Sequence, residues 1–78
     1  ELSYNSLDGK FIKTLPLHHS QCILCDTEDE FRISLRLRIT NDFVMELLSR
    51  SNSLTVIKPQ HLRERVHKIF AEAAKRNS

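Results

Sequence analysis

Residues 16–25 read "PLHHSQCILC" and gather the residue types that bind zinc. Two of the chain's four histidines and both of its cysteines lie within these ten positions. Thiolate sulfur and imidazole nitrogen are the usual ligands of structural zinc, and four of them must converge on the metal from about 2.0–2.3 Å. Zinc binding is therefore the first function to consider. It requires secondary structure that brings these side chains together.

The spacing of the cysteines argues against such a site. In an extended strand, residues three apart point to opposite faces of a sheet, so Cys22 and Cys25 can share a metal only if the strand is bulged. No second pair completes a tetrahedron, because His61 and His67 lie far along the chain. We expect no metal and no other cofactor. The cysteines are interpreted as packing residues, and the "HH" pair as loop residues that cap the preceding helix or bond the hairpin backbone.

The same geometry bears on oxidation of the two thiols. An extended "QCILC" separates its cysteines by roughly 10 Å, beyond the 7 Å or so that a disulfide tolerates. Two cysteines are also too few to staple a small secreted scaffold. We therefore expect free thiols in a reducing, cytoplasmic setting.

A second group of residues suits the binding of anions. The stretch "FRISLRLRI", residues 31–39, alternates apolar residues with Arg32, Ser34, Arg36 and Arg38, and strict alternation predicts a strand with one buried face. Its three arginines would share the opposite face, Arg36 and Arg38 about 6.6 Å apart, where guanidinium groups could hold phosphates or carboxylates. Three interpretations stay open: a solvated face paired with neighbouring acids, a nucleic-acid or nucleotide contact, and a subunit or interdomain contact.

Charge is distributed unevenly along the chain. The net charge is +2 and "DTEDE" contributes four negative charges, so the rest of the chain carries +6. Arg63 and Arg65 belong to a basic C-terminal segment that could track a phosphate backbone, or could form a solvated face with Glu64 and Glu72 interspersed. Aromatic residues are only 6% of the chain and none interleaves with the arginines, which argues against a stacking platform for single strands.

No pattern in the sequence indicates catalysis. The chain has a single glycine, so it has no glycine-rich phosphate loop, and it has neither a nucleophile elbow nor a metalloprotease motif. Ser20 follows His19 directly, but adjacent residues rarely aim at one another. We expect that the protein is not an enzyme.

Length and composition predict one domain over residues 1–78. A chain this short removes only about 60% of its unfolded surface from water on folding. Hydrophobic residues make up 40% and charged residues 28%, without an apolar run long enough for a membrane span. Because Glu1 already reads as strand sequence, we expect a domain cut from a longer protein, with no membrane contact.

Periodicity predicts the elements that position these residues. The expected order is strand, helix, strand, strand, helix, strand and terminal helix, over residues 1–5, 6–15, 21–25, 31–39, 43–48, 54–58 and from Pro59 onward. Asn41 or Asp42 would cap the middle helix, and Asn52 would make the turn after it. This order predicts an α+β, ferredoxin-like split βαβ sandwich with an additional C-terminal helix, whose sheet leaves one face open.

Two predicted helices differ in the clarity of their apolar faces. In residues 6–15, Phe11, Ile12 and Leu15 have helical spacing, although Gly9 lowers the helix propensity. In the terminal helix, one apolar face is interpreted as core, and in a dimer part of it could meet a partner; it comprises Leu62, Val66, Ile69, Phe70 and Ala73.

With the elements in place, the stretches "PLHHSQ", "MELLSR" and "VIKPQHLRERV" resemble the C-terminal extension, called WCX, of bacterial WYL-domain transcriptional regulators. The resemblance extends over "KFIKTLPLHHSQ" and from Phe31 to Phe70, nearly the whole chain. At "SRSNS", residues 49–53, such proteins often carry a glycine, and this stretch has none. The family is not known for metal binding.

The resemblance implies a non-catalytic regulatory and assembly module. Regulators of this family carry a DNA-binding winged-helix domain and a WYL domain upstream, and the extension is ferredoxin-like and supports dimerisation or transmits ligand state. By this resemblance we expect self-association, contacts with a WYL domain, and sensing of an anionic effector such as a nucleic acid or nucleotide through Arg32, Arg36 and Arg38. The alternative is a stand-alone RNA- or single-strand-binding ferredoxin-like domain.

Overall fold

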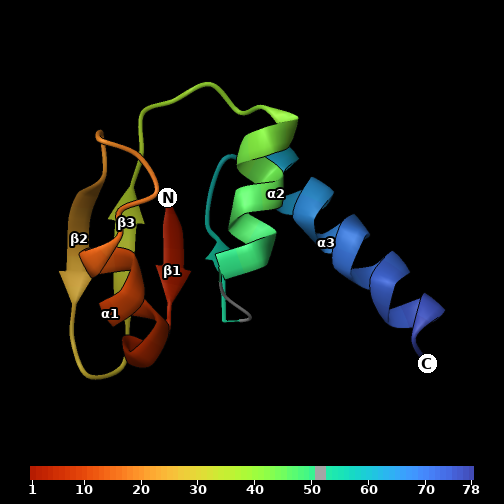
Figure 1. Cartoon of the computed structure of the whole chain (residues 1–78), viewed down its shortest axis with the longest axis horizontal. Coiled ribbons are helices and arrows are strands. Elements are labelled where there is room, and N and C mark those ends of the chain that lie inside the picture. Colours follow the sequence, from red (N-terminus) through yellow and green to blue (C-terminus); the bar gives the residue numbers. More distant parts are fainter. Residues whose placement is uncertain (51–52) are drawn as a thin grey trace.

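The computed structural model describes residues 1–50 and 53–78, which form one antiparallel sheet with helices beside and over it (Figure 1). The turn predicted at Asn52 lies outside the described residues. In chain order the elements are β1 (Leu2–Tyr4), α1 (Ser6–Thr14), β2 (Cys22–Asp26), β3 (Phe31–Ser34), α2 (Asn41–Arg50), β4 (Thr55–Val56) and α3 (Gln60–Arg76). Among the described residues, no helix is long and apolar enough to cross a membrane.

The sheet has the strand order β2-β3-β1-β4, with antiparallel pairing throughout. β3 therefore lies between β1 and β2, the two strands that α1 connects. The predicted α+β fold with an additional C-terminal helix is confirmed. The finer ferredoxin-like arrangement stays a prediction: α1 lies over the sheet, while α2 and α3 lie to the side of β4 (Figure 1).

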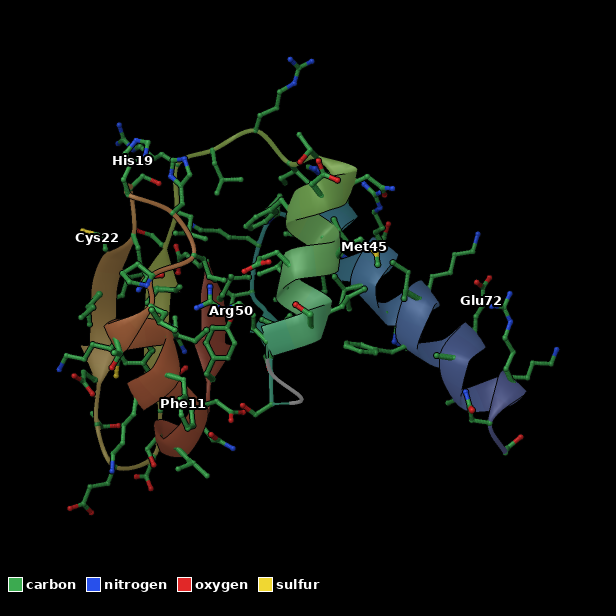
Figure 2. All side chains as sticks on the ribbon, viewed as in Figure 1. Phe11, His19, Cys22, Met45, Arg50 and Glu72 are labelled. Carbon is green, nitrogen blue, oxygen red and sulfur yellow. The ribbon has the colours of Figure 1, made fainter. Side chains whose placement is uncertain are left out.

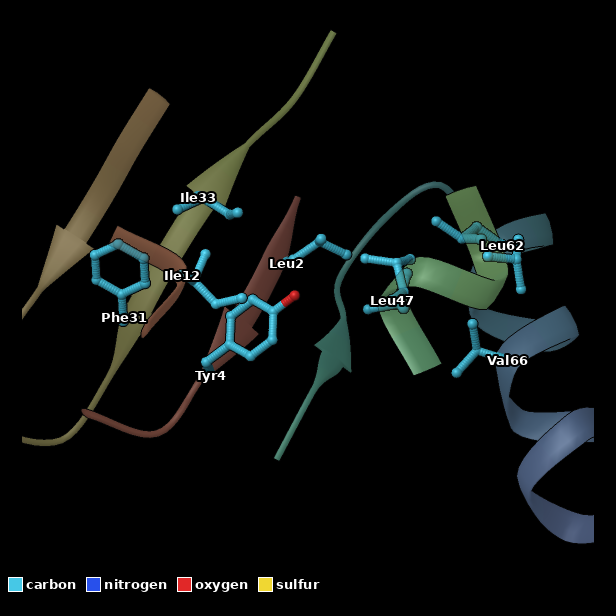
Figure 3. Packing of buried hydrophobic residues seen from close by; sticks show 10 residues of the cluster. Leu2, Tyr4, Ile12, Phe31, Ile33, Leu47, Leu62 and Val66 are labelled. Atoms are coloured by element: carbon cyan, nitrogen blue, oxygen red, sulfur yellow. The ribbon is translucent and has the colours of Figure 1, made fainter. Parts of the chain in front are cut away.

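Alternate residues of the strands bury one face of the sheet. Leu2 pairs with Ile33 and Tyr4 with Phe31, and all four side chains are at most 3% exposed. In Figure 3, Leu47 of α2 lies between the sheet and α3. The fully buried cluster draws on every element except β2, and it consists of Leu2, Tyr4, Ile12, Phe31, Ile33, Val44, Leu47, Val56, Leu62 and Val66.

The predicted helix near the N-terminus forms, and Gly9 explains how it packs. Asn5 caps α1 by accepting a hydrogen bond from the Asp8 amide at 2.8 Å, and Ile12 is buried against the sheet. A Cβ atom on Gly9 would lie 2.4 Å from the Phe31 Cβ. The residue that weakens the helix prediction is therefore the one that allows α1 to approach β3.

The strand predicted over residues 31–39 is wrong beyond Ser34. Along residues 31–39, the pairing with β1 covers residues 31–33 and the pairing with β2 ends at Ser34. Leu35 and Ile39 still pack against the buried cluster. The alternation of apolar and polar residues thus predicts correctly that these side chains pack against the core. It does not predict that the backbone of residues 35–39 lies outside the sheet.

Local contacts correct two further predictions. The α2 amide of Phe43 bonds to Thr40 Oγ1 at 3.2 Å, so Thr40 provides the cap that was assigned to Asn41 or Asp42. The Asn41 side chain instead accepts a hydrogen bond from Arg65 of α3. The strand predicted at 54–58 is reduced to the two residues of β4.

Only the first half of α3 belongs to the core. Leu62 and Val66 are buried, Ile69 is half-buried, Phe70 is 43% exposed and Ala73 is exposed. The prediction that all five residues are core is therefore wrong for the last two. β4 is the edge of the sheet, and the C-terminal half of α3 extends past it (Figure 1).

Candidate functional site

A bulge in β2 places both cysteines on the open face of the sheet. Cys22 pairs with Ser34 and Cys25 with Arg32, two residues that share a face of β3. The register shifts between Ile23 and Cys25, so one residue of β2 is extra. The prediction that the cysteines point to opposite faces is wrong for this reason. Both are free thiols, and Cys22 is exposed, so it is not a packing residue.

His18 of "PLHHSQ" bonds within its own loop, and the His19 ring lies beside it. The His18 and His19 rings lie 4.0 Å apart, and His18 Nδ1 accepts a hydrogen bond from the Ser20 amide at 3.1 Å. The contact to the preceding helix comes instead from Gln21, whose side chain donates to the Ile12 carbonyl at 3.2 Å and accepts from the Leu17 amide at 3.0 Å. Within residues 1–50 and 53–78, no group of three or more His, Cys, Asp or Glu side chains could hold a metal ion.

Ser20 connects this loop to the segment after β3. Its Oγ lies 2.7 Å from His18 Nδ1 and accepts a hydrogen bond from the Arg36 amide at 2.9 Å. Because His18 Nδ1 already accepts from the Ser20 amide, the hydroxyl proton is donated to the same nitrogen. Ser20 therefore links His18 to the backbone of Arg36.

Arg32 stands on the open face of β3 and is paired with an acid. Its Nη2 lies 2.9 Å and its Nε 3.0 Å from Glu30 Oε2, which also accepts from the Ser3 hydroxyl at 2.6 Å. The Ser3 hydrogen bond and the Arg32 guanidinium lower the pKa of Glu30. The structure thus gives Arg32 the neighbouring acid that the solvated-face interpretation requires.

Arg36 and Arg38 lie elsewhere, in the irregular segment between β3 and α2. Both are exposed, and neither forms an ion pair with another described residue. The prediction that the three arginines share one strand face is therefore wrong, because the strand ends before two of them. Arg36 and Arg38 remain together as two free cations on one short segment.

The two candidate arginines of α3 have different surroundings. Arg65 donates a hydrogen bond to Asn41 and so joins α3 to the start of α2. Arg63 lines a cavity of about 190 Å³ between β4 and α3, next to Thr55 and Phe70. The structure does not bring this pair together with the arginines of residues 32–38 into one site.

Comparison of the sequence with known proteins identifies the family to which it belongs. The sequence model of the WCX domain matches residues 8–74. The chain belongs to the WCX family. The resemblance seen in the sequence is thereby confirmed, and all five candidate arginines of this WCX domain lie inside the matched range. No curated protein and no solved structure matches the chain.

The sequence predictions missed an apolar stripe on the outer side of α1 of the WCX domain. Leu7, Phe11 and Leu15 are 63–64% exposed, and Figure 2 shows Phe11 on the side of α1 that no other element covers. The spacing of four residues puts Leu7 and Phe11 on one face of α1, and Leu15 follows as its C-cap residue. That spacing was the available signal, although Ile12 belongs to the buried side of the same helix.

Proposed function

We propose that this WCX domain is a non-catalytic regulatory and assembly module of a bacterial WYL-domain transcriptional regulator. The observation that carries the proposal is the family match over residues 8–74, because this extension accompanies WYL domains in the regulators that the sequence resembles. In such a protein another domain reads DNA. The WCX domain then supports self-association, contacts the WYL domain, and presents cations to an anionic effector.

Two exposed apolar surfaces support the assembly role. The stripe of Leu7, Phe11 and Leu15 is one, and the exposed ring of Phe70 on α3 is the other. Contiguous apolar patches rimmed by charged residues often mark protein contacts. Lys10 and Lys13 belong to the same helix as the first, and Arg63 and His67 line a cavity together with Phe70 of the second.

The exposed cations of residues 35–40 support effector contact. Arg36 and Arg38 have no acidic partner among the described residues, whereas Arg32 has one. A guanidinium group offers two parallel N–H donors to a phosphate or carboxylate. The effector contact is therefore assigned to Arg36 and Arg38 in preference to Arg32.

Sedimentation velocity over a range of concentrations tests assembly. We expect the wild-type domain to form dimers, and Phe11→Glu or Phe70→Glu to shift it toward monomer, because each change puts a charge into an apolar surface. Met45→Glu is the control, since Met45 is 61% exposed and lies in neither surface. A wild-type domain that stays monomeric at high concentration would argue against assembly.

Fluorescence anisotropy of a labelled single-stranded oligonucleotide tests effector contact. At low salt we expect saturable binding that weakens about tenfold in an Arg36→Ala/Arg38→Ala variant and little in Arg32→Ala, since Arg32 is already paired. The alternative, a stand-alone single-strand binder that uses the same arginines together with the basic terminal helix, predicts that Arg63→Ala/Arg65→Ala also weakens binding and that salt weakens binding steeply. An oligonucleotide that binds neither wild type nor variants removes nucleic acid as the effector.

A further inference from the structure

We propose that the cavity between α1 and the turn that follows β2 binds a small zwitterion, a free amino acid with an apolar side chain. All residues that line this cavity lie within residues 6–31. None of the five candidate arginines is among them, so the inference goes beyond the regulatory role and the anion contact proposed above. It combines three properties of the cavity: its size, its buried floor, and two opposite charges that are unpaired at its rim.

One face of α1 and the β2–β3 turn form the walls of the cavity. Lys10 and Lys13 of α1 line one wall, and Asp26 and Glu28 line the other. The volume is about 500 Å³, and small-molecule sites usually measure about 300–1,000 Å³. The turn lies at the opposite end of the sheet from residue 1 (Figure 1). The cavity is therefore large enough for a small organic molecule, and segments close in sequence build it.

Gly9 and Phe31 form the floor. Both residues are buried, whereas the charged residues of the two walls are exposed. Because Gly9 has no side chain, α1 packs directly against Phe31, and a Cβ atom at residue 9 would lie only 2.4 Å from the Phe31 Cβ. The floor thus presents carbon atoms of the helix backbone and of Phe31, which suit an apolar group of the ligand.

Two of the four charged groups in the walls are paired and two are not. Lys13 Nζ lies 2.9 Å from Asp26 Oδ2. Within residues 1–50 and 53–78, Lys10 and Glu28 form no ion pair. Lys10 belongs to the helix wall and Glu28 to the turn wall. The cavity therefore has one unpaired cation on one side and one unpaired carboxylate on the other.

These two charges decide the class of ligand. A simple anion would be repelled by Glu28, and a simple cation by Lys10. A zwitterion satisfies both, because its carboxylate accepts a hydrogen bond from Lys10 and its ammonium group donates one to Glu28. A free amino acid carries both groups on one carbon atom, which leaves its side chain to point toward the floor.

The turn that carries Glu28 is held by hydrogen bonds of Thr27. The Thr27 amide donates to the Glu30 carbonyl at 2.9 Å. Thr27 Oγ1 accepts from the amides of Asp29 and Glu30 at 3.2 and 3.1 Å. The backbone of this wall is thus in place before a ligand binds, which lowers the entropic cost of binding.

Titration of the domain with L-leucine, followed in ¹H–¹⁵N spectra, tests the site. We expect saturable shifts of the amides of Gly9, Lys10 and Glu28, with a dissociation constant of about 1 mM, because the charged groups are exposed to solvent. N-acetyl-leucine lacks the ammonium group and leucinamide lacks the carboxylate. Each should bind at least about tenfold more weakly than leucine.

Two variants assign the two ends of the ligand. Lys10→Gln should weaken leucine binding at least about tenfold and leave leucinamide binding unchanged, since leucinamide has no carboxylate. Glu28→Gln should weaken leucine binding to a similar extent and leave N-acetyl-leucine binding unchanged, since that compound has no ammonium group. A residue that only maintains the shape of the cavity would weaken all three ligands alike.

Lys75→Gln and Glu72→Gln are the matched controls, because they make the same charge changes at exposed positions of α3. Both should bind leucine as the wild type does. Absence of saturable shifts, shifts confined to residues outside the cavity, or equal affinity for leucine and its two analogues would overturn the proposal. None of these results bears on self-association or on Arg36 and Arg38, so the proposed function can stand where this site fails, and the reverse.

Discussion

The hydroxyl group of Tyr4 is buried, and no hydrogen-bond partner for it lies among the described residues. Burial raises the pKa of Tyr4 to about 12; Arg50 lowers it and Asp8 raises it by smaller amounts. The rest of the tyrosine ring fills the core between β1 and its neighbours. A polar group that is buried without a partner reduces stability compared with an apolar group of the same shape.

This hydroxyl gives a prediction for alkaline pH. Since a free tyrosine titrates near pH 10 and the folded group near 12, ionisation favours the unfolded chain. Stability from this group is complete below about pH 10 and is lost as the pH rises toward 12. Tyr4 is the only tyrosine, so phenolate absorbance reports it alone. We expect a midpoint about two pH units higher in the native protein than in urea.

The matching variant is Tyr4→Phe, which should lack this alkaline component. At neutral pH it should be as stable as wild type or more stable by about 1 kcal/mol, because the unsatisfied hydroxyl is gone. Urea unfolding at pH 7 and at pH 10.5 measures both effects. A native midpoint near pH 10, or a clear loss of stability in Tyr4→Phe at pH 7, would show that the hydroxyl has a partner.

At the scale of the element, α1 depends on the missing side chain of Gly9. Alanine has the higher helix propensity, by about 1 kcal/mol, but its Cβ would meet the Phe31 ring carbon Cγ at 2.6 Å. Overpacking of this kind costs about 1–3 kcal/mol. We therefore expect Gly9→Ala to lower the free energy of unfolding, by up to about 2 kcal/mol, measured by urea denaturation. Lys10→Ala, on the exposed side, should be near neutral, and a stabilised Gly9→Ala would contradict the close contact.

The sequence predicts the elements better than it predicts their lengths. Every predicted helix and strand is present, because apolar periodicity decides which side chains can be buried. β3 stops at Ser34 although alternation continues to Ile39, since a strand also needs a neighbouring backbone to pair with, and the ladder with β2 ends at the pair of Cys22 and Ser34. Periodicity in one segment contains no information about the length of another.

The candidate site is predictable in its residue types but not in its grouping. Arg32 has its partner in Glu30, two residues away, and this pair could be expected from the sequence. The separation of Arg36 and Arg38 from Arg32 follows from the end of the strand, and the position of Cys22 follows from a bulge. Both depend on pairing between distant segments, which the local pattern does not record.

At the scale of the whole molecule, the core is one cluster that runs from α1 across the sheet to α3. It ends at Val66, and all residues after Ile69 are exposed. The end of α3 therefore contributes surface for contacts and little to the packing of the domain.

A truncation after Phe70 separates these two contributions. Because the removed residues 71–78 are all exposed, we expect the free energy of unfolding to change by less than about 1 kcal/mol. If α3 takes part in assembly, the same truncation should weaken self-association in sedimentation experiments. Loss of cooperative unfolding would show instead that the end of α3 is needed for the fold.

The bulge in β2 also has an evolutionary consequence. Inserting or deleting one residue elsewhere in a strand exchanges its two faces. Deleting Leu24 is different, because it would remove the extra residue and leave Ile23 opposite Ile33 and Cys25 opposite Arg32. Leu24 is thus the position at which β2 can lose a residue without exchanging its two faces. We expect deletions among related WCX sequences to be most frequent at this position.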